Sequence, residues 1–175
     1  KEIKGEPRNA SFQLNELSFG SYSQKNISLT SKINGENVKS ILSFSNMNSN
    51  GYRYNTDYNK SNYFIKTSFT NGGQPINLIT SFTENKFGAN GFYASPSATE
   101  QYEETQASLV GLSTSFKSSK LVLKPKVYWR RGQDEYIYIR DNPSIYRNLH
   151  KTNKFSAELS GSYFSNSGVT GFGLD

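Results

Sequence analysis

Side chains that could bind a ligand are concentrated in three irregular, polar stretches, at 47–61, 84–104 and 131–152. The first contains GYRYNTDY, and the last interleaves arginines, carboxylates and tyrosines. Tyrosine and arginine are enriched at recognition hot spots, because they combine flat apolar area with hydrogen-bond donors. We therefore expect a ligand-binding surface formed by Tyr52, Arg53, Asn55, Asp57, Tyr93, Tyr138, Arg140 and Tyr146.

A solvated loop without a ligand is the alternative interpretation of the 131–152 stretch. Arg140 and Arg147 can pair with Asp141 or Glu135 merely to order the loop, and an exposed ion pair contributes only ~0–1 kcal/mol. In the first stretch, Tyr54 and Tyr58 can instead belong to an interfacial rim.

Calcium is the metal that these stretches could bind, and Asp57 is its candidate ligand, because hard cations take oxygen ligands from polar loops. A calcium cage needs about six to eight oxygens. The segment NTDYN offers one carboxylate, so Glu84, Asp134 or another segment would have to contribute. We expect no other cofactor.

The sequence argues against an enzyme. His150 is the only histidine, no G-x-S-x-G motif occurs, and the absence of cysteine excludes a thiol nucleophile and a thiolate metal site. Glu103 and Glu104 are adjacent, and neighbouring residues of a strand point to opposite faces. These two carboxylates therefore cannot converge on one substrate.

The elements that position these stretches are predicted to be strands. Apolar and polar residues alternate with a period of two, which is the strand signal. The alternation is clear at 26–33, 62–70, 76–83 and 153–164, looser at 38–46, 105–116 and 121–130, and ambiguous in phase at 11–19; a last strand begins at 169. We predict an all-β, antiparallel up-and-down meander of about nine strands, with Pro125 marking a bulge or a local break.

The connections between these strands alternate in length. The tight ones are NGEN at 34–37, NGGQP at 71–75, KSSK at 117–120 and SNSG at 165–168. The long polar stretches alternate with them, and SYSQK at 21–25 takes a long-loop position although it is short. A meander therefore places every tight turn at one end and every long loop at the other, which is typical of an outer-membrane barrel.

Composition agrees with a transmembrane β-barrel. Only 34% of the residues are hydrophobic, yet 14% are aromatic, and the mean hydropathy is −0.70. A barrel strand is half apolar and half polar, so a soluble-looking average can hide a lipid-facing surface. No apolar run approaches the ~20 residues of a membrane-spanning helix. The net charge of +6 is scattered without a basic stripe, so we expect no nucleic-acid partner.

Aromatic residues are predicted to form two rings that bound the apolar band, as membrane-interface girdles do. The upper ring contains Phe44, Tyr63, Phe82, Trp129 and Phe155, and the lower ring contains Phe69, Phe116 and Tyr163. We expect a multi-pass protein of the bacterial outer membrane that contacts lipid and lipopolysaccharide. A soluble sandwich, whose aromatics fill a core, is the alternative.

Three segments resemble TonB-dependent outer-membrane receptors, and most of all the vitamin B12 (cobalamin) transporter-like receptors of the Bacteroidetes. They are GYRYNTDYNKSNYF at 51–64, KFGANGFYASPSATEQYEET at 86–105 and YWRRGQDEYIYIRDNPSIYRNLHKTN at 128–153. They occur in the right order between strands of suitable length, and the resemblance runs from about Leu29 to the end.

The resemblance implies a barrel of 22 strands, closed by an N-terminal plug and driven through TonB by the proton gradient of the inner membrane. The implied cargo is a small chelate, either cobalamin or an iron–siderophore complex, and a surface lipoprotein is an implied partner. Residues 1–175 show too few strands and neither a plug nor a TonB-contacting segment. The charged start, KEIKGEPRNA, also lacks a signal peptide. We therefore expect a partial β-barrel domain of a longer protein. A structural or adhesive surface β-protein without cargo remains the alternative function.

Overall fold

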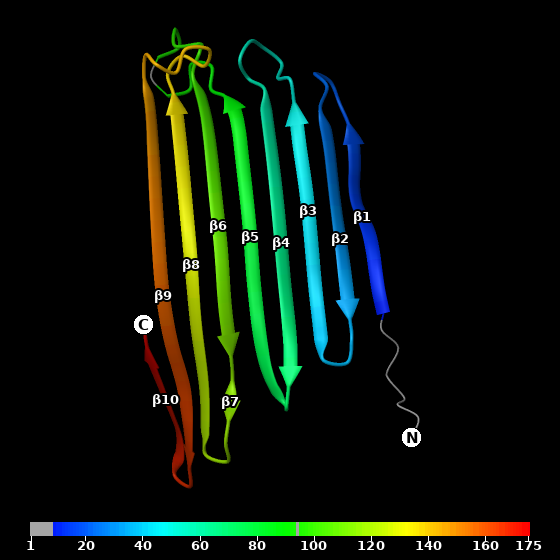
Figure 1. Cartoon of the computed structure of the whole chain (residues 1–175), viewed down its shortest axis with the longest axis vertical. Coiled ribbons are helices and arrows are strands. Elements are labelled where there is room, and N and C mark those ends of the chain that lie inside the picture. The colour runs from blue at the N-terminus through cyan, green and yellow to red at the C-terminus, as the bar shows by residue number, and fades with distance from the viewer. Residues whose placement is uncertain (1–8, 94) are drawn as a thin grey trace.

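The computed structural model describes residues 9–93 and 95–175, which form a single antiparallel sheet (Figure 1). Strands follow one another in chain order, so the predicted all-β meander is confirmed. They are β1 (Asn9–Phe19), β2 (Lys25–Asn34), β3 (Val38–Ser49), β4 (Tyr58–Asn71), β5 (Gln74–Gly88), β6 (Tyr102–Thr114), β7 (Phe116–Lys117), β8 (Leu121–Ile137), β9 (Arg147–Ser165) and β10 (Gly168–Leu174). No helix long and apolar enough to cross a membrane occurs in this part of the chain. The charged start discussed above lies, up to residue 8, outside the described residues.

The sheet has ten strands where nine were predicted, because one predicted strand is interrupted. β6 pairs with β8 as far as Ser113 opposite Lys126, and β7 resumes the pairing with Phe116 opposite Leu123. The unpaired gap contains Pro125 on β8, which has no N–H to donate to the ladder. The register is the same on both sides of the gap, so the proline marks a local break and not a bulge.

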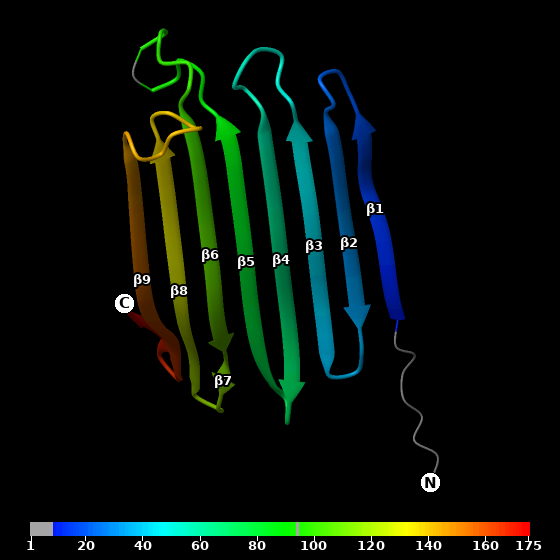
Figure 2. The same cartoon turned by 45° about the horizontal axis from the view of Figure 1, so that its top comes forward.

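The tight turns lie at one end of the sheet and the longer loops at the other, as the sequence predicted (Figures 1 and 2). The turn between β4 and β5 shows why the tight turns can be so short. Gly72 and Gly73 have φ values of 57° and 82°, and a two-residue hairpin turn of this kind requires positive φ at both positions. Glycine adopts such angles without the steric cost that a Cβ would bring.

The three long connections are shorter than predicted, because the strands continue further toward the loop end. The connections run over 50–57, 89–101 and 138–146, instead of 47–61, 84–104 and 131–152. Near this end polar residues occur on both faces of the sheet, so the period-two hydrophobic signal fades. The backbone ladder does not depend on that signal and continues, with Tyr58 opposite Phe87 and Glu103 opposite Tyr136.

The two faces of the sheet differ in chemistry. Residues directly opposite each other share a face, which places Phe44, Tyr63 and Phe82 side by side. We call their side the apolar face; it also carries Leu29, Leu42, Ile65, Leu78, Val110, Leu112, Val127 and Leu159. The opposite side, here called the polar face, carries Thr30, Ser43, Asn62, Lys66, Asn77, Ser81, Ser113, Lys126, Lys154 and Ser160.

A bulge in β1 explains why the alternation at 11–19 was ambiguous. Leu14 lies opposite Leu29, and Leu17 lies opposite Ile27, although Leu14 and Leu17 are separated by an odd number of positions. The register shift between Leu14 and Glu16 absorbs the extra residue. Both leucines therefore reach the apolar face, which a regular strand would not allow.

All eight predicted interface aromatics lie on the apolar face, at two levels. The upper ones form two contacting groups: the ring of Tyr63 is 5.1 Å from that of Phe44 and 6.2 Å from that of Phe82, and Trp129 stacks on Phe155 at 6.4 Å. The lower ones face aliphatic neighbours, with Phe69 opposite Ile76, Phe116 opposite Leu123 and Tyr163 opposite Leu121.

No second layer covers either face of the sheet in the described ranges. Phe12 and Phe155 on the apolar face are 71% and 78% exposed. The only buried hydrophobic residues described, Ala89 and Ile137, lie at the loop end and not between layers. A soluble sandwich needs two packed sheets, and the described residues 9–93 and 95–175 form one. The sheet is not closed into a barrel: β1 and β10 end the strand order.

Candidate functional site in the long loops

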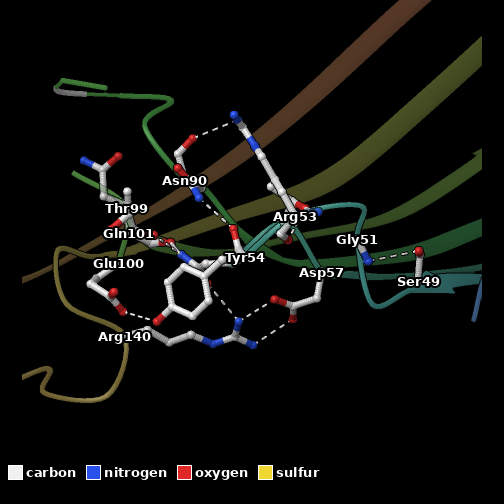
Figure 3. A network of polar contacts seen from close by, with 12 residues as sticks. Ser49, Gly51, Arg53, Tyr54, Asp57, Asn90, Thr99, Glu100, Gln101 and Arg140 are labelled. Carbon is white, nitrogen blue, oxygen red and sulfur yellow. Dashed lines mark hydrogen bonds and ion pairs between the residues drawn. The ribbon is translucent and has the colours of Figure 1, made fainter. Parts of the chain in front are cut away.

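Arg140 ties the third long loop to the first (Figure 3). Its guanidinium donates to both carboxylate oxygens of Asp57, at 2.5 and 2.8 Å, and to Oδ1 of Asn55 at 3.0 Å. The guanidinium also lies over the ring of Tyr102, 4.5 Å from its centroid. A bidentate pair of this kind fixes orientation as well as distance. A partner for Arg140 within its own loop was the alternative interpretation of the sequence; the structure instead provides a partner that is 83 residues away.

Asn55 ties the first loop to the second. Its side-chain amide donates to the backbone carbonyls of Thr99 and Gln101 at 2.9 and 2.6 Å, and the residue is only 9% exposed. Asn55 adopts a left-handed conformation with φ of 49°, which asparagine tolerates better than most residues. A Cβ on Gly88 would lie 2.5 Å from the Asn55 carbonyl oxygen, so this close approach requires glycine.

Three further contacts join the first and second loops near their surface. Asn90 donates from its amide to the carbonyl of Tyr54 at 2.7 Å, and Arg53 donates to the carbonyl of Asn90 at 3.2 Å. The hydroxyl of Tyr54 donates to Glu100 at 2.6 Å. The three loops are therefore held together by side-chain contacts to one another (Figure 3).

A buried glutamine organises the aromatic part of the site. Gln101 is fully buried, donates to the hydroxyl of Tyr136 at 2.5 Å and accepts from the backbone N–H of Tyr93 at 3.3 Å. The rings of Phe92, Tyr93, Tyr136 and Tyr146 follow one another edge to face, with centroid separations of 4.7, 5.6 and 6.1 Å. Edge-to-face packing is a favoured aromatic geometry.

Charge and burial shift several pKa values at this end of the molecule. The Arg140 guanidinium holds the pKa of Asp57 below its usual range, and Asp57 in turn raises the pKa of Arg140. Partial burial beside Phe92 and Tyr136, followed by the nearby carboxylate of Glu103, raises the pKa of the Tyr93 phenol, although 45% of the residue is exposed. Burial likewise raises the pKa of Glu103, with a further contribution from the charge of Asp134. Asp57 therefore stays ionised and Tyr93 stays neutral at ordinary pH.

The predicted site residues fall into two groups. Asn55, Asp57 and Arg140 bind other parts of the protein, so their polar atoms hold the loops together. Tyr52, Tyr93, Tyr138 and Tyr146 are exposed and remain available to a ligand, with Tyr52 66% exposed. Arg53 lies between these groups, because it donates to Asn90 while its guanidinium lies 5.4 Å from the ring centre of Tyr52.

Sequence reasoning missed Asn90, Glu100 and Gln101 as residues that build the site. It left Tyr54 and Tyr136 out of the predicted ligand-binding set, although both lie in the stretches that it singled out. An interfacial rim was the alternative interpretation of Tyr54 and Tyr58. Tyr54 instead lies in the loop network, and the register places Tyr58 on the polar face. The pairing of Arg147 with Glu135, at 2.6 Å, was among the predicted alternatives and is confirmed.

The geometry around Asp57 bears on its candidacy as a calcium ligand. Both of its carboxylate oxygens accept hydrogen bonds from Arg140, so a cation would have to displace that side chain. Glu84 bonds Lys86 and Gln106 on the sheet. Across residues 9–93 and 95–175, no cluster of three or more histidine, aspartate or glutamate side chains is arranged to hold a metal.

Comparison with known proteins adds no assignment: neither a protein-family model, nor a curated protein, nor a solved structure matches the chain.

Proposed function

We propose that the chain is part of the wall of a TonB-dependent outer-membrane transporter that takes up a scarce nutrient chelate. One observation carries this proposal: a single sheet has a polar face and an uncovered apolar face bounded by aromatic residues. Such a sheet is unfavourable in water, because large contiguous apolar surface drives association. It suits the wall of a barrel, whose outer side faces lipid and whose inner side faces a polar lumen.

The spacing of the aromatic levels supports the lipid-facing role. On β4, Tyr63 and Phe69 are six positions apart, which corresponds to roughly 20 Å of strand. On β8, Leu121 and Trp129 are eight positions apart, which corresponds to roughly 27 Å. Because barrel strands are tilted by about 35–45°, these lengths correspond to roughly 14–22 Å across the membrane, somewhat less than the apolar band of about 25 Å that surrounds outer-membrane barrels.

In this proposal the loop cluster forms part of the outer mouth. The Arg140–Asp57 pair and Asn55 order the loops before a ligand binds. The loops therefore lose less conformational entropy when the ligand binds. The exposed tyrosines and Arg53 then provide flat apolar area beside hydrogen-bond donors, which suits a small chelate such as cobalamin or an iron–siderophore complex. The role is binding and transport, energised through TonB by way of a plug domain, and not catalysis.

Extraction behaviour tests the membrane part of the proposal. The complete protein should fractionate with outer membranes and require detergent for solubility. A protein that is soluble and monomeric without detergent would rule out a lipid-facing sheet.

Calorimetry tests the cargo. Cobalamin and a ferric siderophore should be titrated into the complete detergent-solubilised protein, and a Tyr138→Ala, Tyr146→Ala variant should weaken whichever binds. Absence of binding by both chelates would contradict the cargo assignment. It would favour the alternative of a structural or adhesive surface protein.

A further inference from the structure

A hollow in the apolar face has a size and lining that suit a hydrocarbon chain. Its volume is about 550 Å³, and it lies over β6, β8 and β9. Its lining on the apolar face consists of Val110, Leu112, Val127, Trp129, Phe155 and Ala157. Ala157 lies directly opposite Val127. Because its side chain is a single methyl group, it leaves space above the sheet at this point.

The loop-side end of the hollow is capped by two stacked aromatic rings. Trp129 and Phe155 lie opposite each other in the ladder, with their ring planes 29° apart. The indole Nε1 of Trp129 donates to Oδ1 of Asn153 at 3.1 Å. The continuous apolar surface of β8 and β9 therefore ends at Trp129 and Phe155, and the next pair on this face, Arg131 and Asn153, lies two ladder positions further toward the loops and is polar.

Two cations lie above this cap on the same face. Arg131 is opposite Asn153, and Lys151 is opposite Gln133, so both belong to the apolar-face side of β8 and β9. Neither forms an ion pair with any residue that the structure describes. The carboxylate on the same face of β8, Glu135, is already paired with Arg147. Positive charge therefore stands uncompensated directly above an apolar hollow.

We propose that β8 and β9 bind one anionic, phosphate-bearing lipid, with an acyl chain in the hollow and the phosphate between Arg131 and Lys151. This inference rests on the proposed function, because it requires the apolar face to be surrounded by lipid. The planar guanidinium of Arg131 suits bidentate contact with phosphate oxygens, and the ammonium of Lys151 adds a compact charge. The side-chain amide nitrogen of Asn153, whose oxygen accepts from the Trp129 indole, adds a hydrogen-bond donor at the level where a headgroup begins.

The combination distinguishes a lipid from a free anion. A soluble phosphate has no apolar part to bury in the hollow. A lipid in a single orientation buries its acyl chain in the hollow and pairs its phosphate with the two cations. Each cation near a membrane surface contributes roughly fivefold to the local enrichment of an anionic lipid.

Fluorescence of Trp129, the only tryptophan of these 175 residues, provides the test. The complete protein, with any tryptophan outside these residues replaced by phenylalanine, is reconstituted into phosphatidylcholine vesicles. A minor fraction of the lipid is brominated phosphatidylglycerol or, in parallel, brominated phosphatidylcholine at the same fraction. We expect the anionic lipid to quench Trp129 several-fold more strongly. The Arg131→Gln, Lys151→Gln variant should lose this preference.

Matched controls are available on the other side of the sheet. Arg130 and Lys154 lie directly opposite each other on the polar face, next in sequence to residues of the site. The Arg130→Gln, Lys154→Gln variant loses the same charge and should keep the preference. Equal quenching by both lipids, or equal loss in both variants, would overturn the lipid site alone. No quenching in vesicles made entirely of brominated phosphatidylcholine would instead contradict the proposed membrane location.

Discussion

At the scale of residues, the Arg140–Asp57 pair should stabilise the loop cluster measurably. Both side chains are partly exposed, so solvent screening limits the stabilisation. With the bidentate geometry and the Tyr102 ring included, we expect a coupling energy of about 1 kcal/mol. We expect Arg140→Ala and Asp57→Ala each to destabilise the loops, and the double variant to cost less than their sum. A double-mutant cycle on loop opening, followed by amide hydrogen exchange, measures this coupling.

The Arg147–Glu135 pair is the matched control for that cycle. It has one contact, at 2.6 Å, and joins strands that the ladder already holds together. Its coupling energy should therefore be smaller. Equal coupling in the two pairs would contradict a special role for Arg140 in joining the loops.

Asn55 should matter through both its backbone and its side chain, and two variants separate these effects. Asn55→Gly keeps the left-handed backbone but removes the bonds to Thr99 and Gln101, which should cost about 1–3 kcal/mol of local stability. Asn55→Ala adds roughly 1 kcal/mol of backbone strain. Limited proteolysis of the 89–101 loop reports both. Equal stability of the alanine and glycine variants would contradict the expected strain of a residue with a Cβ in the left-handed conformation.

At the scale of elements, acid should loosen the loop cluster before the sheet. The pKa of Asp57 is lower in the folded protein than its unfolded value of 3.8, because Arg140 stabilises the carboxylate. The ion pair's contribution is therefore fully present above pH ~4 and is lost as pH falls through the folded pKa. Hydrogen exchange should show faster opening of 50–57 and 138–146 at pH 3 than at pH 6, after correction for intrinsic rates, while β4 and β5 stay protected.

The Asp57→Asn variant is the control for acid loosening. It lacks the titrating carboxylate, so its loops should open to a similar extent at both pH values. If the variant retained the full pH dependence, another group, such as Glu103, would be responsible.

The strands were predictable from sequence where one face is apolar, and less so elsewhere. Between the aromatic levels, the alternation placed β2, β3, β4 and β5 on the correct faces. Above those levels, polar residues occur on both faces and the alternation fades while the backbone ladder continues, so the ends of β8 and β9 were interpreted as loop. The bulge in β1 hid the phase of that strand, because one inserted residue reverses the alternation.

The site was predictable in composition but not in contacts. The tyrosines and arginines of the loops marked the region. The pairing of Arg140 with Asp57 joins residues 83 positions apart and depends on β4, β5, β6 and β8 being neighbours. Gln101 could not be predicted from the sequence, because nothing in a polar segment distinguishes a buried glutamine from an exposed one. Long-range contacts of this kind follow from topology and not from local pattern.

At the scale of the whole molecule, one pair of substitutions decides what surrounds the apolar face. Leu78 lies on that face, between the aromatic levels, and Asn77 beside it lies on the polar face, where it accepts a hydrogen bond from Ser68. In lipid, Leu78→Lys should destabilise the complete protein by about 2–4 kcal/mol, because a charge near the bilayer midplane is costly. Asn77→Lys should cost only about 0.5–1.5 kcal/mol, for the lost hydrogen bond.

Urea unfolding of both variants in phosphatidylcholine vesicles measures this difference. The comparison is sharp because the two residues are adjacent, receive the same charge and differ only in the face that they occupy. In water, an exposed leucine replaced by lysine would change stability little, since surface substitutions usually stay within about 0.5 kcal/mol. A near-neutral Leu78→Lys would therefore place water, and not lipid, against the apolar face. It would contradict the proposed barrel wall and the lipid site together, whereas a large cost confined to Leu78 supports the lipid-facing orientation on which both depend.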